Sequence, residues 1–254
     1  MLVNISNKIL MCIFEKLKIW RYIEMAKFIV IDGLDGCGKA TQVANIKKRL
    51  EAEGKRVITI SFPNYESDSS AAVKMYLGGE LGSDPTKLNP YMCSSFYAVD
   101  RFIQYTKEFQ KYFEEDNNTI ILADRYISAN IIHQGGKIKG MMNRTVFAKW
   151  CYEYECKLCG MPKEDMTIVL TLKPEISQKL MAKRYNGNES KKDIHEANVA
   201  YLQQCYDAVN FYFETINKNR IAFWYVLNCE KNGTIAPIEE ITDKLMEKIH
   251  SVVK

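Results

Sequence analysis

A glycine-rich stretch between an apolar run and a helical pattern is the feature that most constrains this chain. The apolar, β-branched run KFIVID covers residues 27–32, GLDGCGK follows, and a helical pattern covers 39–53. A strand, a glycine turn and a helix N-terminus in this order surround phosphate with backbone N–H groups, and a lysine adds a charge for terminal phosphates. The loop predicted to bind phosphate consists of Gly33, Leu34, Asp35, Gly36, Cys37, Gly38, Lys39, Ala40 and Thr41.

One position departs from the usual pattern of such loops. Ala40 follows Lys39 where a serine or threonine hydroxyl normally touches Mg²⁺. Thr41 is rotated by about 100° around the helix and does not replace that hydroxyl. Because Mg²⁺ usually keeps several waters and needs few protein oxygens, we expect weaker metal binding and not an inactive site.

The rest of the chain alternates apolar runs with helical patterns. Further strands are expected at 56–62, 118–126, 166–172 and 221–229. Further helices are expected at 69–77, 90–115, 143–159, 174–184, 193–217 and 237–252. This alternation predicts an α/β fold, with a parallel sheet covered by helices on both faces, in one domain over 25–254.

Residues 1–24 precede the first predicted strand and lack the alternation of strands and helices that follows. Apolar residues at 9, 13, 14, 17 and 20 lie near helical spacing, so we expect a helical or disordered N-terminal extension, or an over-long start, without a function of its own. The alternative is a docking helix for a partner or a membrane surface. The apolar run 9–14 is too short to span a membrane, and charged residues follow it at once.

Charge and cysteine usage narrow the class of protein further. The net charge of +4 suits anionic small substrates but is too weak to indicate a nucleic-acid surface. The eight cysteines show no disulfide framework, so we expect a cytoplasmic protein. Cys151, Cys156 and Cys159 resemble half of a zinc site, but no second half lies nearby, and reduced thiols are expected.

Four polar stretches follow the predicted strands, where open α/β sheets bind ligands. They are FPNY (62–65), FYAVDR (96–101), LADRYISAN (122–130) and the basic AKRYNGNESKKDIHE (182–196). Arg101 and Arg125 together suit a second phosphate, and the aromatic residues suit a base. A cationic segment at about 183–195 suits a lid over the transferring group.

These motifs, in this order over residues 27–254, resemble the thymidylate kinase family. The matching set is G-x-D-G-x-G-K, F-P-x-Y, A-x-D-R, D-R-Y with an asparagine five residues after the arginine, GMPKED and D-x-x-E. The resemblance implies a P-loop kinase fold with about five parallel strands, ATP and dTMP as substrates, Mg²⁺ as cofactor, and a homodimer.

The resemblance also implies roles for the loop and the strand ends. The glycines and Lys39 would hold ATP, with Thr41 near the nucleotide. Asp35 would lie between the sugar 3′-hydroxyl of dTMP and the metal region. Asp124 would orient the donor and Mg²⁺ through water. Asp35, Lys39 and Arg125 are thus candidate catalytic residues.

The resemblance also implies which residues contact the acceptor, dTMP. Those expected to bind dTMP are Phe62, Tyr65, Tyr97, Arg101, Arg125, Asn130 and His133. Tyr65, Arg101 and Arg125 would bind its phosphate. Tyr97 would stack on thymine and Asn130 would read the base. His133 falls near a place where a tyrosine can guard the sugar 2′ position, and position 64 is Asn where some members carry a basic residue.

The lid must supply the transition-state cation. Family members carry a catalytic arginine in the loop or in the lid, and this loop has none. Arg184 is the first candidate, followed by Lys183, Lys191 and Lys192. His195 is expected to be a lid-helix surface residue and not a catalyst.

Three functions remain open on the sequence. The first is a dTMP kinase. The second is a kinase for a deoxynucleoside or another monophosphate such as dUMP. The third is a non-catalytic nucleotide-binding regulator, for which Ala40 is the only support.

Overall fold

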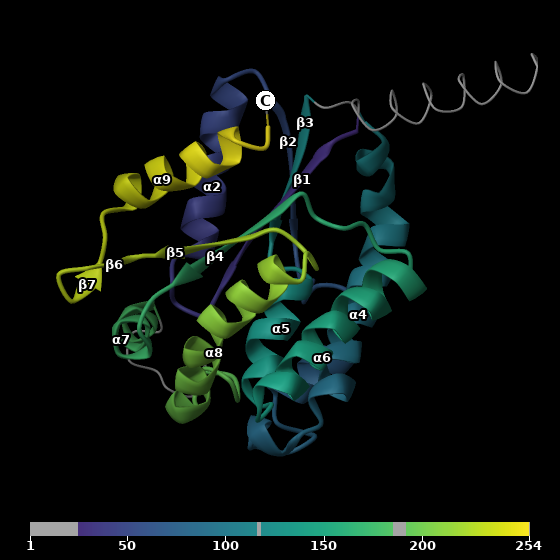
Figure 1. The fold of residues 1–254 in the computed structure, drawn as a ribbon, viewed down its shortest axis with the longest axis vertical. Coiled ribbons are helices and arrows are strands. Elements are labelled where there is room, and N and C mark those ends of the chain that lie inside the picture. The colour runs from purple at the N-terminus through teal and green to yellow at the C-terminus, as the bar shows by residue number, and fades with distance from the viewer. Residues whose placement is uncertain (1–24, 116–117, 185–191, 254) are drawn as a thin grey trace, which may run out of the picture.

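A five-stranded parallel sheet forms the centre of the protein. The computed structural model describes residues 25–115, 118–184 and 192–253. The strands are β1 (Lys27–Gly33), β2 (Arg56–Ser61), β3 (Thr119–Asp124), β4 (Met166–Thr171) and β5 (Trp224–Asn228). Their order is β2-β3-β1-β4-β5, and every neighbouring pair is parallel (Figure 1). The predicted α/β class with about five parallel strands is confirmed.

Burial explains why these runs pair as inner strands. All six residues of β4 are buried, and β1 and β3 are buried along almost their whole length. β-branched side chains fit a pleated surface that is covered on both faces. The register sets Ser61 beside Asp124, and Asp124 beside Ile31. The carboxyl ends of β2, β3 and β1 therefore open at one edge of the sheet.

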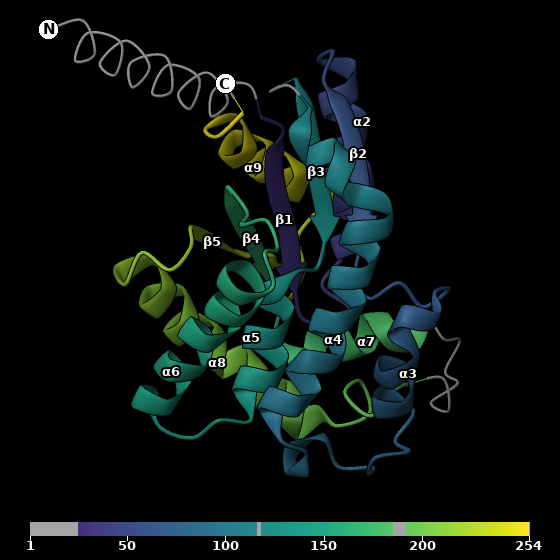
Figure 2. The same ribbon diagram turned by 90° about the vertical axis from the view of Figure 1, so that its right-hand side faces the viewer.

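Helices cover both faces of the sheet (Figures 1 and 2). On one face α2 (Lys39–Ala52) and α9 (Ile238–His250) pack against each other and share a core with β1, β3 and β4. On the other face lie α4 (Pro90–Gln104), α5 (Ile127–Gly136), α6 (Met141–Tyr152) and α8 (Val199–Lys218). This second layer supplies most of the larger core.

Local signals set where several helices begin and which face they bury. Asn89 caps α4, because its side chain accepts hydrogen bonds from the backbone N–H groups of Tyr91 and Met92. Asn198 caps α8 in the same way through Tyr201. In α9 the buried Ile241, Leu245 and Ile249 recur every four residues.

Shorter elements connect these layers. They are the 3₁₀ turns Asp68–Ser70, Pro85–Lys87 and Gln110–Glu114, α3 (Ala71–Leu77), the π-helical turns Tyr105–Phe109 and Glu153–Leu158, α7 (Pro174–Arg184), and the hairpin β6 (Glu230–Lys231) with β7 (Thr234–Ile235). Figure 2 shows α3 and α7 near the end of the molecule where the strands open.

Three element predictions need correction, and one helix was missed. The expected helix over 90–115 is α-helical only to Gln104 and continues as π and 3₁₀ turns. The expected helix over 143–159 is α-helical only to Tyr152 and continues as a π turn. The expected helix over 193–217 begins at Val199, because Asp193 ties the preceding residues into a turn and Asn198 caps the helix. Helix α5 was not predicted, because LADRYISAN was interpreted as the end of a strand followed by polar binding residues.

Two expectations lie outside the described residues. They concern the N-terminal extension 1–24 and most of the lid, residues 185–191. Within the described part of the chain, no helix is both long enough and apolar enough to cross a lipid bilayer.

Candidate active site

The glycine loop occupies the junction of β1 and α2, as predicted. Gly33 has a φ of +143°, and a Cβ there would lie 2.2 Å from the carbonyl oxygen of Leu170 on β4. Gly38 caps α2 with a φ of 90° in the left-handed region. These positions require glycine, because a side chain would meet neighbouring backbone or a strained dihedral angle. The free N–H groups at the start of α2 are left for an anion.

Lys39 reaches back along this loop. Its ammonium donates hydrogen bonds to the carbonyl oxygens of Gly33 at 3.0 Å and Leu34 at 2.9 Å. It also lies 4.0 Å from the carboxylate of Asp35. Only 8% of Lys39 is exposed. The charge is thus held within the loop by its own partners, beside the N-terminus of α2.

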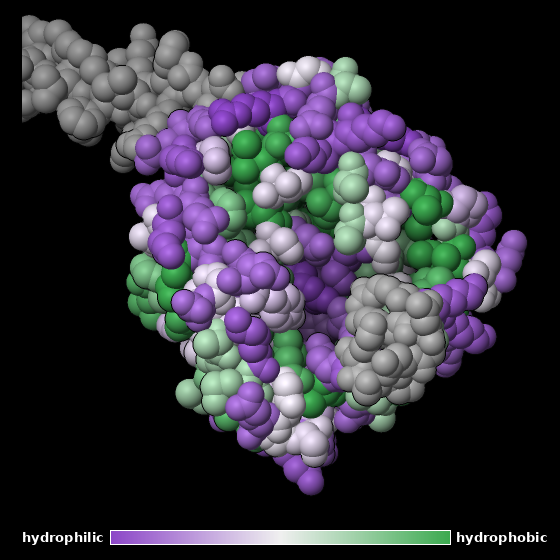
Figure 3. Space-filling model, turned by 180° about the vertical axis from the view of Figure 1, so that it is seen from behind, coloured by the Kyte–Doolittle hydropathy of each residue, from purple (hydrophilic) through white to green (hydrophobic). Residues whose placement is uncertain are grey.

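A wide hollow opens in front of the loop. Its volume is about 1060 Å³, and residues 35–42 of the loop and of α2 line one side. Ala40 and Thr41 are exposed on that side. A hollow of this size accommodates a nucleotide. Figure 3 shows the molecule from behind, where the surface is hollowed near its centre and hydrophilic in its depth.

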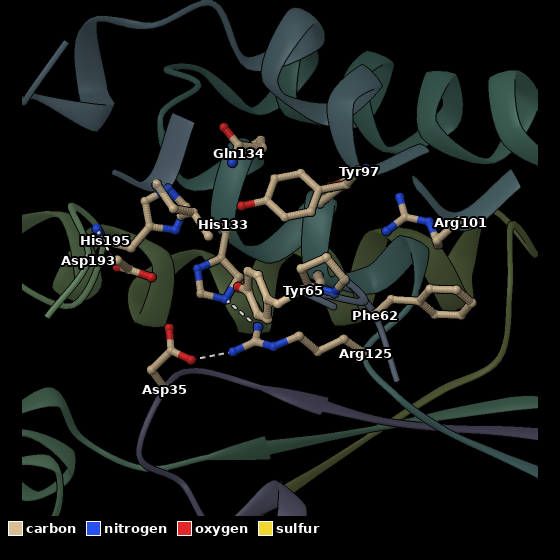
Figure 4. Close-up of a pocket in the computed structure, with 14 residues that line it drawn as sticks. Asp35, Phe62, Tyr65, Tyr97, Arg101, Arg125, His133, Gln134, Asp193 and His195 are labelled. Carbon is tan, nitrogen blue, oxygen red and sulfur yellow. Dashed lines mark hydrogen bonds and ion pairs between the residues drawn. The ribbon is translucent and has the colours of Figure 1, made fainter. Parts of the chain in front are cut away.

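A narrow branch leads from the wide hollow between α4 and α5. Residues common to the two cavities include Asp35, Phe62, Tyr65 and Arg125. Figure 4 shows the side chains around the narrow branch, with Asp35 and Arg125 on one side of it and Tyr97 across from them. The loop lysine and the predicted acceptor residues therefore face one continuous cavity.

Arg125 stands at the junction of the two cavities. It follows β3 with a φ of 70°, and its backbone N–H donates to the carbonyl oxygen of Ile31 at 3.0 Å. Its guanidinium forms an ion pair with Asp35 and lies 3.0 Å from Nε2 of His133 (Figure 4). A left-handed backbone is uncommon for a non-glycine residue and occurs often at functional sites.

The charges at this junction hold each other in the ionised form. Burial alone would raise the pKa of Asp35, but the positive charges of Arg125 and Lys39 lower that pKa well below its usual value. Burial alone would lower the pKa of Arg125, but the neighbouring carboxylates, Asp35 first, raise it. Asp35 is consequently an anion at working pH and not a proton donor.

Arg101 differs from the expectation that it grips a phosphate together with Arg125. Its guanidinium is 1% exposed and pairs with Glu155, Nε to Oε2 and Nη2 to Oε1, both at 2.7 Å. In Figure 4 Arg101 lies on the far side of Tyr97 from Asp35. Because Arg101 is buried away from Asp35 and Arg125 (Figure 4), we infer that it serves the far end of the narrow branch and not the phosphate end.

His195 is not the surface residue that the sequence indicated. Its side chain is buried, and Nε2 lies 2.6 Å from the hydroxyl of Tyr76 on α3. Its ring stacks on His133 with centroids 5.5 Å apart. Burial lowers the pKa of His133 to about 3 and the pKa of His195 well below its usual value. Both imidazoles are therefore neutral near pH 7 and line the narrow branch.

Comparison with known proteins gives a family for this chain. The family model described as thymidylate kinase matches residues 31–222. The chain belongs to the thymidylate kinase family. Thymidylate kinase of Caldicellulosiruptor saccharolyticus is 28% identical over 229 residues, covering 90% of this chain and 98% of that protein. Thymidylate kinase of Mycobacterium tuberculosis is 24% identical over 217 residues, covering 82% and 97%.

A solved structure supports the fold independently. Thymidylate kinase from Candida albicans superimposes with a TM-score of 0.57 at 17% identity, over 90% of this chain and 92% of that one. Membership of the thymidylate kinase family makes this chain an ATP-dependent phosphotransferase that converts dTMP to dTDP.

Asp124 offers a buried oxygen atom that fits a metal ion. Oδ1 of Asp124, at the end of β3, is buried and has no hydrogen-bond partner among the described residues. A buried acceptor without a partner costs about 1–3 kcal/mol, so a cation or its water fits there. Asp124 lines the wide hollow beside the loop. A hard oxygen ligand of this kind suits Mg²⁺.

Several residues of this site were missed by the sequence analysis. Asp100, next to Arg101, accepts hydrogen bonds from the N–H of Asn64 and from Ser69, and so anchors the FPNY loop to α4. Asp32 is buried at the end of β1, where burial raises its pKa, and accepts from Ser128. Both carboxylates lie inside quoted stretches, FYAVDR and KFIVID, where they were given no role. The available signal was a charged residue among apolar neighbours. Tyr97 and Ile103 lie at helical spacing around Asp100, and Val30 and Leu34 lie at strand spacing around Asp32.

The hairpin β6–β7 was also missed. Ile235 in this hairpin approaches Gly38, and together with Ile238 it lines the wide hollow. Two residues per strand show no alternation, but the turn Asn232-Gly233, with φ of 53° and 74°, was a signal that could have found this hairpin.

The three clustered cysteines line neither cavity. Cys151 is buried, Cys156 and Cys159 are half-buried, and all three are free thiols in the α6 region. No group of three metal-ligating side chains comes together in residues 25–115, 118–184 and 192–253. Arg184 ends α7, and its side chain lies outside the described part, as does Lys191.

Proposed function

We propose that the phosphoryl transfer takes place at the junction of the two hollows, with ATP in the wide hollow and dTMP in the narrow branch. This proposal rests on the residues at the junction. Lys39 on the donor side lies 4.0 Å from the carboxylate of Asp35, and Asp35 pairs with Arg125 on the acceptor side. Two anion-binding groups face each other there, as transfer between two phosphates requires.

The donor would be held by backbone groups. The N–H groups at the start of α2 and the ammonium of Lys39 would contact the β- and γ-phosphates of ATP. Thr41 on the exposed side of α2 would lie near the nucleotide. Catalysis here is electrostatic, because preorganised positive charge stabilises the charge that develops on the transferred group.

The acceptor would be oriented by side chains of three elements. Arg125 would bind the dTMP phosphate, with Tyr65 at the mouth of the branch. Tyr97 on α4 offers an aromatic face for the base. Phe62 packs at the start of the FPNY loop, and His133 lies where the sugar would pass. The attacking phosphate oxygen is already anionic, so no general base is needed.

Mg²⁺ would be held by Asp124 and by phosphate oxygens, with Asp35 reaching it through water. When bound, it neutralises charge on the β- and γ-phosphates. Because Ala40 supplies no hydroxyl, the protein contributes fewer oxygens than usual, and water completes the coordination. Asp124 then gains the partner that its buried oxygen otherwise lacks.

The lid would close over the γ-phosphate. We assign Arg184, at the end of α7, as the transition-state cation, because the loop interior 34–37 carries no arginine. Arg184→Ala should then lower kcat and leave dTMP binding nearly unchanged. Equal losses in kcat and in dTMP affinity would contradict the assignment.

The protein would act as a homodimer. Exposed apolar side chains gather on two neighbouring helices, Met92, Val99 and Phe102 on α4 and Met142 and Val146 on α6. An exposed apolar patch of this kind marks a contact surface. Light scattering should give twice the mass of one chain, and Phe102→Glu should halve it. A wild-type mass of one chain would contradict the homodimer.

One coupled assay of ADP release tests the function against its alternatives. With dTMP, dUMP, thymidine and CMP as acceptors, we expect the highest kcat/KM for dTMP. Turnover of thymidine above dTMP would indicate a deoxynucleoside kinase. ATP binding without turnover of any acceptor would indicate a regulator.

A further inference from the structure

A buried carboxylate that no sequence motif identified lies behind two residues of the narrow branch, Arg101 and Asn130. Glu155 lies in the π-helical turn Glu153–Leu158 after α6 and is 1% exposed. Its two oxygens accept from Arg101, and Oε1 also lies 3.4 Å from Nδ2 of Asn130. A π turn inside a helix is rare and often occurs at functional sites. One carboxylate thus contacts two side chains that line the branch.

Glu155 and the backbone oxygen of Ser94 together fix how the Asn130 amide is turned. Nδ2 of Asn130 donates to the backbone oxygen of Ser94 at 3.2 Å as well as to Glu155. A carbonyl and a carboxylate only accept hydrogen bonds, so the NH₂ group must face them. Oδ1 of Asn130 is then directed away from Glu155. It has no partner among the described residues, although Asn130 lines the narrow branch.

Glu155 also fixes which donor Arg101 presents. The carboxylate takes Nε and Nη2 in a bidentate pair, the most directional form of this contact. Nη1 has no hydrogen-bond partner in the described part of the chain, and Arg101 lines the same branch as Asn130. The end of the branch therefore offers one donor from Arg101 beside one acceptor from Asn130.

We propose that Glu155 is a positioning residue that sets this donor–acceptor pair and thereby selects the acceptor base. Thymine and uracil present an acceptor at O4 beside a donor at N3–H, which complements Arg101 and Asn130. Cytosine presents a donor at N4 beside an acceptor at N3. Its N4 donor would face the Arg101 donor, and its N3 acceptor would face the Asn130 acceptor, so neither hydrogen bond could form. The inference rests on the proposed function, since it requires a nucleotide base in the narrow branch.

Glu155→Gln tests the proposal with almost no change in shape. A glutamine keeps one oxygen for Arg101, but its NH₂ group would face the second N–H donor of Arg101, so the bidentate pair is lost. Nη1 of Arg101 is then no longer held toward the branch, while the backbone oxygen of Ser94 still holds the Asn130 amide. We expect the ratio of kcat/KM for dTMP over dCMP to fall by about 10–100-fold, the size of a mismatched base contact.

The change should fall on KM and not on kcat. Glu155 contacts neither the glycine loop nor Arg125, so kcat for dTMP should stay within about threefold of wild type, while KM rises in proportion to the lost hydrogen bonds. A ratio of dTMP to dCMP that stays at the wild-type value, with both substrates weakened equally, would show that Glu155 only supports the fold and would overturn the proposal.

Glu164→Gln is the matched control. Glu164 is another buried carboxylate, bonded to Tyr152 and Thr167, and it does not line either hollow. It should leave the dTMP to dCMP ratio unchanged. An equal fall of the dTMP to dCMP ratio in both variants would also overturn the proposal, because it would show that loss of any buried carboxylate disturbs the fold enough to change base preference.

A second variant covers the case in which Glu155→Gln does not fold. Glu155→Asp keeps a negative charge beside the buried Arg101 but is shorter by one methylene, so the bidentate geometry is lost while Arg101 stays in place. It should lower thymidine affinity and the preference for thymidine over deoxycytidine, measured by calorimetry without turnover. An unchanged preference would overturn the proposal. Absence of dTMP turnover in the wild type would instead refute the proposed function, and the calorimetry would still decide on Glu155.

Discussion

Replacing Arg125 by methionine should separate acceptor binding from donor binding. Arg125 pairs with Asp35 and carries the positive charge that faces the narrow branch. Methionine keeps most of the side-chain length but removes that charge, and it leaves the Asp35 carboxylate with Lys39 at 4.0 Å as its remaining cation.

The magnitude follows from the charges at the junction. Two unit charges 4 Å apart interact by about 4 kcal/mol at the effective dielectric constant of a partly buried site. The side chain of Arg125 is 20% exposed, so this value applies with little screening. Loss of one such contact to the dTMP phosphate corresponds to a dissociation constant about 10³-fold higher.

Calorimetric titration measures this effect directly. Arg125→Met should weaken dTMP binding by about 10³-fold and change ATP binding by less than about tenfold. Adding Asp35→Asn removes the unbalanced negative charge, so the double variant should bind dTMP more tightly than Arg125→Met alone. Arg144→Met on α6 is the control and should bind both nucleotides normally. Among the described residues, its guanidinium contacts the backbone oxygen of Ile138 and the ring of Phe211, and Arg144 lines neither cavity.

Two results would refute the reasoning. One is dTMP binding by Arg125→Met within about threefold of wild type, which would place the phosphate elsewhere. The other is a double variant that binds dTMP no more tightly than the single one, because the Asp35 charge would then have no influence on the acceptor site.

Four further predictions concern the loop, the metal and buried titratable groups. Lys39→Met should lower kcat by about 10²–10³-fold in the ADP-release assay. Ala40→Ser should lower the Mg²⁺ concentration for half-maximal rate by about tenfold, the value of one added contact, and EDTA should abolish turnover until Mg²⁺ is restored. Burial raises the pKa of Glu164 from 4.5 to about 6, so the folded state binds a proton that the unfolded state has lost, and the free energy of unfolding falls as pH rises from 4.5 to 6. Glu164→Gln should remove this pH dependence, which amounts to about 2 kcal/mol and is measured by urea unfolding. Burial lowers the pKa of His133 from 6.5 to about 3, so its contribution is present above pH 6.5 and is lost as pH falls towards 3; His133→Gln should shift acid unfolding, followed by circular dichroism, to lower pH.

The sequence by itself determined the features that depend on local order. Alternating apolar runs and helical patterns predicted the α/β class, and GLDGCGK between a strand and a helix predicted the phosphate loop. These signals are local, because the dihedral freedom of glycine and the period of apolar residues act over a few neighbours. The order of motifs along the chain was then enough to indicate the family.

Only the tertiary structure decided which charges remain available for a ligand. Arg101 and Arg125 look alike in the sequence, yet packing buries Arg101 against Glu155, 54 residues away, and places Arg125 beside Asp35 at the junction of the two cavities. His195 reads as a surface residue until Tyr76, 119 residues away, buries it. Burial and charge pairing depend on partners that packing brings together, and a sequence pattern carries no record of those distances.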